Sequence, residues 1–129
     1  MPFLKSIHHI AIICSDYATS KDFYTRVLGL SVLSEHYRTE RKSWKLDLAL
    51  HNNYIIELFS FPGSPQRPSR PEACGLRHLA FAVDNLTEAI AELNKKGVVT
   101  EPVRMDEHTG RHFTFFADPD GLTLELYER

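Results

Sequence analysis

An internal repeat is the feature of this sequence that most limits its fold. Residues 9–16, HIAIICSD, are echoed by residues 78–85, HLAFAVDN. In each copy an alternating apolar segment is followed by a helical pattern that ends at a glycine, Gly29 in the first and Gly97 in the second. The repeat therefore predicts two copies of one supersecondary unit.

The predicted helices have recognisable starts. Asp16 or Ser15 can cap the first helix, and Asn85 with Glu88 three residues later resembles a capping box at the second. The apolar face of the first helix consists of Phe23, Tyr24, Val27 and Leu28. That of the second consists of Leu86, Ala89, Ile90 and Leu93.

Three predicted strands follow each helix. They cover residues 30–38, 43–51 and 54–61 in the first copy, and residues 98–106, 111–118 and 122–128 in the second. Both copies thus have the order βαβββ, which predicts an α+β fold with two modules whose curved mixed sheets enclose a cavity. We expect a single domain over residues 1–129, with module one at about 5–61, a proline-rich linker at 62–75 and module two at about 76–129.

Composition narrows the partners. The hydrophobic fraction of 43% is enough for one buried core. The net charge is −2, so the overall charge does not favour binding to nucleic acid or to an anionic membrane. No apolar run approaches the length of a membrane span. The two cysteines, Cys14 and Cys74, form no CxxC pair, and two histidines interrupt the apolar run at the N-terminus. We expect a cytoplasmic protein that binds a small molecule.

Two carboxylates interrupt apolar strands at equivalent places. Glu57 lies within YIIELF and Glu125 within LTLELYE. Glu57 follows His9 by 48 positions, and Glu125 follows His78 by 47. Because an isolated buried carboxylate costs several kcal/mol, each glutamate requires a compensating charge.

A strand glutamate commonly faces solvent or pairs with an arginine, and a strand histidine is commonly a satisfied core or surface residue. Independent structural needs would seldom keep both residue types in both copies, so the repeated pairs favour a metal. His9, Glu57, His78 and Glu125 would give two nitrogen and two oxygen ligands, which suit one divalent Ni, Zn, Co, Mn or Fe per chain. His8, next to His9, is predicted to point the other way.

The motifs HHIAII, FYTRVLGL, IIELF, RHLAFAVDN and DPDGLTLELYE resemble those of the vicinal oxygen chelate superfamily, and within it bacterial glyoxalase I. The resemblance covers nearly the whole chain. It implies that His9, Glu57, His78 and Glu125 are the metal ligands of a lyase or isomerase. It further implies that Glu125 is the catalytic base and that Glu57 is the more stable ligand or a second proton acceptor.

The substrate implied by this resemblance is a small α-oxygenated carbonyl compound, such as a thiol hemithioacetal. Residues 61–78 do not match the corresponding segment of glyoxalase I. Arg67, Arg70 and Arg77 of this segment are candidate substrate-binding residues, since guanidinium groups bind carboxylates and phosphates. Cations of the first module, Arg38, Arg41, Lys42 and Lys45, could do the same.

Three alternatives remain open at this point. A thiol transferase or a dioxygenase of the same superfamily would need only two histidines and one glutamate, and a binding protein would need no metal. Relatives of this size build two cavities as homodimers. The resemblance therefore implies a homodimer, with metal sites either within one chain or shared between two chains.

Overall fold

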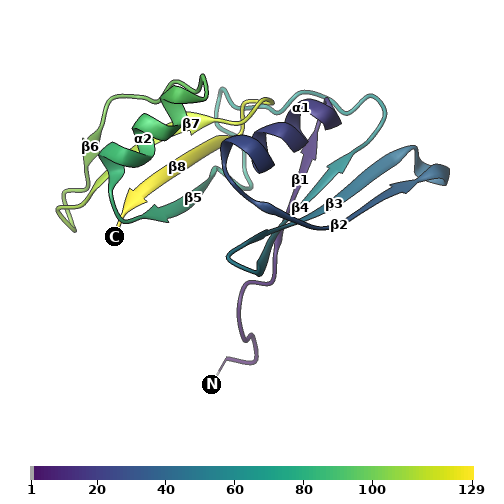
Figure 1. The fold of residues 1–129 in the computed structure, drawn as a ribbon, viewed down its shortest axis with the longest axis horizontal. Coiled ribbons are helices and arrows are strands. Elements are labelled where there is room, and N and C mark those ends of the chain that lie inside the picture. Colours follow the sequence, from purple (N-terminus) through teal and green to yellow (C-terminus); the bar gives the residue numbers. More distant parts are fainter. Residues whose placement is uncertain (1) are drawn as a thin grey trace. The chain divides into compact units, whose positions relative to one another are not determined.

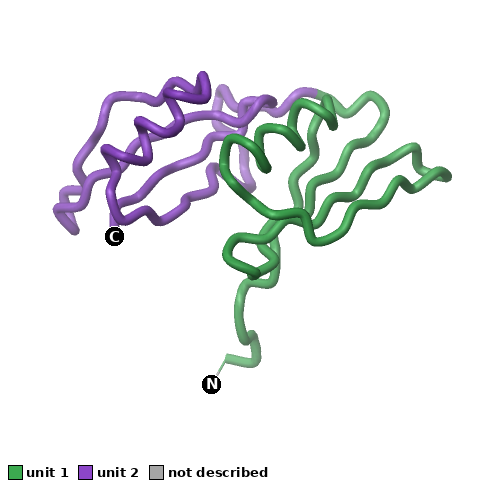
Figure 2. Tube along the Cα trace, in the orientation of Figure 1, with its two compact units in different colours: residues 1–65 green, residues 66–129 purple. Residues whose placement is uncertain are grey.

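The computed structural model describes residues 2–129 and divides into two compact units. The first ends at Pro65 and the second begins at Gln66 (Figure 2). Across the described residues, no helix is long and apolar enough to cross a membrane.

The first unit contains a four-stranded mixed sheet. Its strands are β1 (Ile10–Cys14), β2 (Ser31–Arg38), β3 (Ser43–Leu50) and β4 (Asn53–Ser60), in the order β1-β4-β3-β2. Strands β1 and β4 are parallel, and the other neighbours are antiparallel. Between β1 and β2 lie α1 (Tyr17–Asp22) and a π-helical segment, η1 (Phe23–Val27), and a short 3-10 turn, η2 (Thr39–Arg41), precedes β3 (Figure 1).

The second unit repeats this design. Its strands are β5 (His78–Val83), β6 (Arg104–Met105), β7 (His112–Ala117) and β8 (Thr123–Glu128), in the order β5-β8-β7-β6. Helix α2 (Leu86–Lys95) follows β5. The prediction of an α+β fold built from two βαβββ modules with mixed sheets is confirmed.

Helix starts and stops follow the predicted signals. The Asp16 side chain accepts a hydrogen bond from the Thr19 amide, and Asn85 accepts one from the Glu88 amide. Such caps are worth about 1 kcal/mol each. Gly97 has φ +84°, a left-handed conformation in which a side chain would be strained, and this explains why α2 ends there.

Each sheet buries one face against its helix. In the first unit the buried face of the sheet is the one opposite the Glu57 side chain. The buried residues include Ile12, Leu46, Leu48, Ile56 and Leu58. In the second unit Leu124 and Leu126 flank Glu125 and are buried with Phe116, Leu86 and Leu93. Since side chains alternate along a strand, both glutamates point to the face opposite these core residues.

Two predicted elements differ from the structure. The strand expected over residues 98–106 is only Arg104–Met105, because Pro102 has no amide hydrogen and cannot extend the ladder. The first helix is α-helical only to Asp22 and then continues as the π-helical segment. The predicted apolar positions Phe23, Tyr24 and Val27 are nevertheless buried.

Candidate metal centre

The first unit brings His9 and Glu57 together. His9 directly precedes β1, and Glu57 lies in the middle of β4, the parallel neighbour of β1. His9 Nε2 is 3.5 Å from Glu57 Oε1, and 34% and 16% of the two side chains are exposed. The carboxylate is therefore mostly buried beside an imidazole that still reaches solvent.

The second unit brings His78 and Glu125 together in the same way. His78 Nε2 is 3.1 Å from Glu125 Oε1, and the Glu125 side chain is 11% exposed. Phe115 lies opposite Glu125 on β7, and its ring also contacts the ring of His78 at a centroid distance of 5.4 Å. Among residues 2–129, His78 is the only ion-pair partner of Glu125.

Strand register explains why the two pairs are alike. Glu57 is opposite Ala11 in the β1–β4 ladder, and Glu125 is opposite Ala80 in the β5–β8 ladder. Each histidine lies two residues before that alanine. His78 begins β5 and so shares a face with Ala80, diagonally across from Glu125. His9, just before β1, takes the equivalent place beside Glu57. The sequence predicted these two pairs correctly, and the duplication extends to the side chains.

The distance within the second pair fits two ligands of one metal ion, and the distance within the first pair is slightly longer than expected for such ligands. Two donors about 2.1 Å from a divalent transition metal, at angles between octahedral and tetrahedral, are about 3.0 to 3.4 Å apart. The observed separations are 3.5 Å for His9 with Glu57 and 3.1 Å for His78 with Glu125. Within the described part of the chain, no single cluster contains three or more potential ligands. Each unit thus offers two candidate ligands, half of the predicted set.

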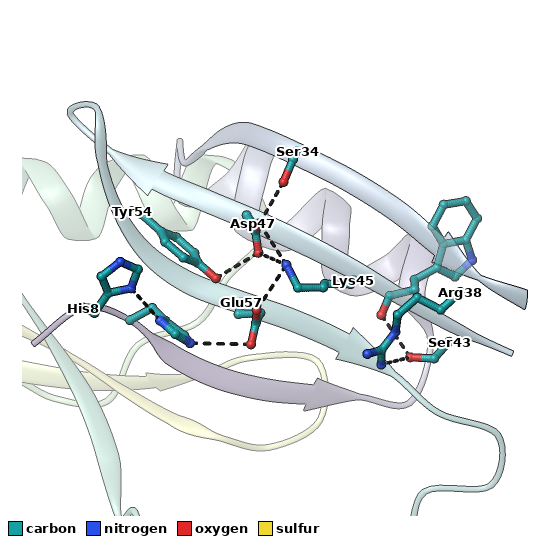
Figure 3. A network of polar contacts seen from close by, with 10 residues as sticks. His8, Ser34, Arg38, Ser43, Lys45, Asp47, Tyr54 and Glu57 are labelled. Carbon is teal, nitrogen blue, oxygen red and sulfur yellow. Dashed lines mark hydrogen bonds and ion pairs between the residues drawn. The ribbon is translucent and has the colours of Figure 1, made fainter. Parts of the chain in front are cut away.

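In the first unit a polar network surrounds Glu57 (Figure 3). Among residues 66–129, no such network surrounds Glu125. Lys45 Nζ is 3.2 Å from Glu57 Oε2 and 3.0 Å from both oxygens of Asp47. Asp47 also accepts hydrogen bonds from the hydroxyl groups of Ser34, at 2.8 Å, and Tyr54, at 2.9 Å. Lys45 was predicted as a cation for a substrate anion, whereas its contacts here are with Asp47 and Glu57.

These contacts fix the charges of the network. The pKa of Lys45 is raised, mainly by its hydrogen bond to Asp47. Burial lowers this pKa, whereas the hydrogen bond to Glu57 raises it further. Burial, followed by the hydrogen bond to Asp47, raises the pKa of Tyr54. Burial would raise the pKa of Asp47, but the bonds from Ser34, Lys45 and Tyr54 outweigh it and the pKa is lowered. Lys45 is therefore a cation, Asp47 an anion and Tyr54 a neutral phenol at neutral pH.

His8 and Tyr54 were not predicted as part of this site. The Nδ1 atoms of His8 and His9 are 2.8 Å apart, so the prediction that His8 points away is wrong. Strict alternation does not apply because β1 begins only at Ile10. The Tyr54 ring stacks on His9 with a centroid distance of 4.9 Å. Together these neighbours occupy Nδ1 and one ring face, which leaves Nε2 directed at Glu57.

A cavity of about 280 Å³ lies within the second unit. Its lining includes the three arginines predicted to bind substrate, Arg67, Arg70 and Arg77, and the candidate ligand His78. Arg104 of β6 also lines it, and its guanidinium lies 5.5 Å from the centroid of the Phe115 ring. Arg104 was not singled out from the sequence, because a two-residue strand after a proline has little periodic signal.

Comparisons with known proteins agree with this architecture. A relative from Bacillus subtilis (strain 168), the uncharacterized protein YwkD, is 64% identical over 126 residues that cover 98% of each chain. A lactoylglutathione lyase of Escherichia coli O157:H7 is 30% identical over 127 residues, covering 93% of this chain and 90% of the lyase. The crystal structure of a glyoxalase family protein from Enterococcus faecalis has a TM-score of 0.92 and 52% identity, and the match covers 98% of this chain and all of that one.

The resemblance inferred from the sequence motifs is confirmed by a match over almost the whole chain. The family model described as the Glyoxalase/Bleomycin resistance protein/Dioxygenase superfamily matches residues 6–126. With its two βαβββ units and the repeated His–Glu pairs, the chain belongs to the glyoxalase/bleomycin resistance/dioxygenase superfamily.

Proposed function

We propose that this protein is a metal-dependent lyase or isomerase of the glyoxalase I type, acting on a small α-oxygenated carbonyl compound such as a thiol hemithioacetal. The observation that carries the proposal is the presence of two His–Glu pairs at equivalent positions of two duplicated sheets, with donor atoms 3.5 Å and 3.1 Å apart. The similarity to lactoylglutathione lyases supports the same reaction class.

His9, Glu57, His78 and Glu125 are the proposed ligands of one divalent metal per chain. When bound, such an ion would stabilise negative charge on a carbonyl oxygen and so acidify the adjacent C–H bond. The cation would also compensate two carboxylates whose side chains are only 16% and 11% exposed.

The two glutamates have different roles in this proposal. Glu57 is held by Lys45, so accepting a proton would cost it an ion pair, and we assign it as the fixed ligand. Glu125 has only His78 as a polar partner in the described chain and faces the Phe115 ring, so little restrains its carboxylate. We assign Glu125 as the base that takes a proton from one carbon and returns it to the next.

The second carboxylate also separates this proposal from the alternatives. A thiol transferase or a dioxygenase of the superfamily would not require Glu57. Yet Glu57 is kept in the same relation to His9 as Glu125 is to His78. A binding protein without metal would need neither buried carboxylate, and Glu125, whose only ion-pair partner among residues 2–129 is His78, would then be a net cost.

We further propose that the protein acts as a homodimer. Three apolar residues before β1, Phe3, Leu4 and Ile7, are 86%, 72% and 86% exposed, and Ile13 of β1 is 54% exposed. Apolar side chains exposed together commonly mark an interface. A second chain is the partner that the family resemblance implies.

Metal analysis and a substrate screen test this function. Untagged protein should contain one divalent metal per chain by elemental analysis, and the His9→Ala, His78→Ala double variant should lose it. Each metal is then restored to metal-free protein, which is assayed with α-dicarbonyl compounds alone and with their thiol adducts. Unchanged metal content and thermal stability in the double variant would show that the ligand assignment is wrong.

A further inference from the structure

The cavity of the second unit has an excess of positive charge. Four arginines and two glutamates line it: Arg67, Arg70, Arg77, Arg104, Glu72 and Glu101. With neutral histidine, the lining side chains therefore carry two more positive than negative charges. A cavity with such an excess attracts anions through its positive potential.

Both glutamates are already paired. Arg77 Nη2 is 2.9 Å from Glu72 Oε1, and Arg104 Nη2 is 2.8 Å from Glu101 Oε1. These pairs neutralise two of the four arginines. The excess charge therefore belongs to Arg67 and Arg70.

Within residues 2–129, the two remaining arginines have no anionic partner. Arg67 donates to the backbone carbonyl oxygens of Leu76, at 2.5 Å, and Arg77, at 3.4 Å, so it closes the loop without losing its charge. For Arg70, no hydrogen bond or ion pair occurs with any residue from 2 to 129. Its five N–H donors are thus available to a ligand.

The rest of the lining indicates what kind of ligand fits. The volume of about 280 Å³ is just below the range of about 300 to 1,000 Å³ typical of small-molecule sites, so the cavity suits one small molecule or one end of a larger one. His78 and Thr123, which are opposite each other in the β5–β8 ladder, also line it. A molecule bound to Arg70 would therefore lie in the same cavity as the candidate ligand His78.

We propose that this cavity binds the anionic end of a small molecule, a phosphate monoester or a carboxylate group, with Arg70 as its main charged contact. The inference rests on the proposed function, since the other end of the molecule would carry the oxygen atoms beside His78. It narrows the substrate to an α-oxygenated carbonyl compound with an anionic tail. The tail belongs either to the carbonyl compound or to a thiol joined to it.

Calorimetric titration at fixed ionic strength tests this inference on the full chain. The protein is titrated as purified, with its metal content measured, and again after chelation. The probes are 2-phosphoglycolate, inorganic phosphate, glycolate and glutathione. We expect 2-phosphoglycolate to bind more tightly than glycolate, and Arg70→Gln to weaken binding by about tenfold or more, the usual effect of losing a hydrogen bond to a charged group.

Two further variants make the result specific. Arg111→Gln removes the same charge from an exposed position of the second unit outside the cavity lining and should leave binding unchanged. Glu72→Gln frees Arg77 and should tighten binding. The inference is overturned if Arg70→Gln and Arg111→Gln weaken binding equally. It is also overturned if 2-phosphoglycolate and glycolate bind equally and Arg70→Gln does not change the affinity for glutathione.

The glutathione titration identifies the source of the tail. Arg70-dependent binding of glutathione alone assigns the tail to a thiol, and Arg70-dependent binding of 2-phosphoglycolate assigns it to the carbonyl compound. Failure of the two proposals can be distinguished. Arg70-dependent binding by a protein without metal or activity would refute the proposed reaction only. An active metalloenzyme whose KM does not respond to Arg70→Gln would refute the cavity inference only.

Discussion

Lys45 pairs with Glu57 at 3.2 Å, and no lysine or arginine among residues 2–129 pairs with Glu125 in this way. Lys45 lies two residues before Asp47, which is opposite Glu57, and Phe113 lies two residues before Phe115, which is opposite Glu125. The duplicated strands therefore keep the His–Glu pairs but differ in the strand beside them. This difference makes two chemically identical carboxylates unequal.

Substitution of each glutamate should separate metal binding from turnover. We expect Glu57→Gln to weaken the metal, because it removes the ligand that Lys45 holds. Glu125→Gln should lower kcat by about 10² to 10⁴, the usual contribution of a general base, while metal remains bound. Elemental analysis and steady-state kinetics on the substrate found by screening measure both quantities. Full turnover by Glu125→Gln protein would eliminate Glu125 as the base.

Removal of the lysine should partly relieve the loss of Glu125. In Glu125→Gln protein, Glu57 cannot replace the base because Lys45 restrains it. Adding Lys45→Met frees that carboxylate and should raise kcat at least about tenfold over Glu125→Gln alone, a small part of what a positioned base supplies. Lys42→Met removes an exposed lysine from the turn before β3 and is the control. If both lysine variants behave alike at equal metal content, the asymmetry has no catalytic role.

Strand positions could be predicted from the sequence because they depend on local periodicity. The His–Glu pairs could be predicted because the internal repeat places them at equivalent positions. The alternation around Glu57 and Glu125, and their nearly equal spacings of 48 and 47 positions from the histidines, predicted the pairs. The alternation of Lys45 and Asp47 in SWKLDLAL also placed two charges on one face of β3, a signal that could have identified the network. Their partners depend on which strands are neighbours, which one strand's pattern does not specify.

Contacts made outside regular elements were not accessible in this way. The contact between His8 and His9 forms before β1 begins, where period-two alternation has no meaning. The arginines of the proline-rich segment could be proposed as ligands of an anion from charge alone. The pairing of Arg77 with Glu72, which leaves Arg70 without a partner in the described part of the chain, depends on loop geometry.

The Asp47 network should make a pH-dependent contribution to stability. We expect Asp47→Asn to lower the free energy of unfolding by about 1 to 3 kcal/mol at pH 7, since mostly buried Lys45 loses one of its two anionic partners and keeps only Glu57. The pKa of Asp47 is lowered from 3.8 in the folded state. Its charge therefore stabilises the fold above that value, and the contribution is lost as pH falls through the folded pKa.

Urea denaturation of wild-type and Asp47→Asn proteins between pH 7 and pH 3 measures this difference. It should stay constant down to about pH 5 and shrink below pH 4. Asp22→Asn breaks an exposed i,i+4 pair with Arg26 and should have a much smaller effect at every pH. A difference for Asp47→Asn that does not change between pH 5 and pH 3 would contradict the assignment.

The last prediction concerns how the two half-sites are combined. We expect a mass of twice the 14.8 kDa chain in solution by light scattering. Co-expression of His9→Ala and His78→Ala chains then distinguishes sites within chains from sites shared between chains. If module one of each chain combines with module two of its partner, every heterodimer has one site with both histidines and one with neither.

Random pairing makes half of the dimers heterodimers, and one of the two sites in each heterodimer is intact. Shared sites should therefore restore about one quarter of the wild-type metal content and activity. Each variant alone should have none. Sites within single chains would give no restoration, because every chain lacks one histidine. The control pairs His9→Ala with the His9→Ala, His78→Ala double variant, which contains no intact module one and should restore nothing under either arrangement. Restoration in that control would mean that His9 is not a ligand.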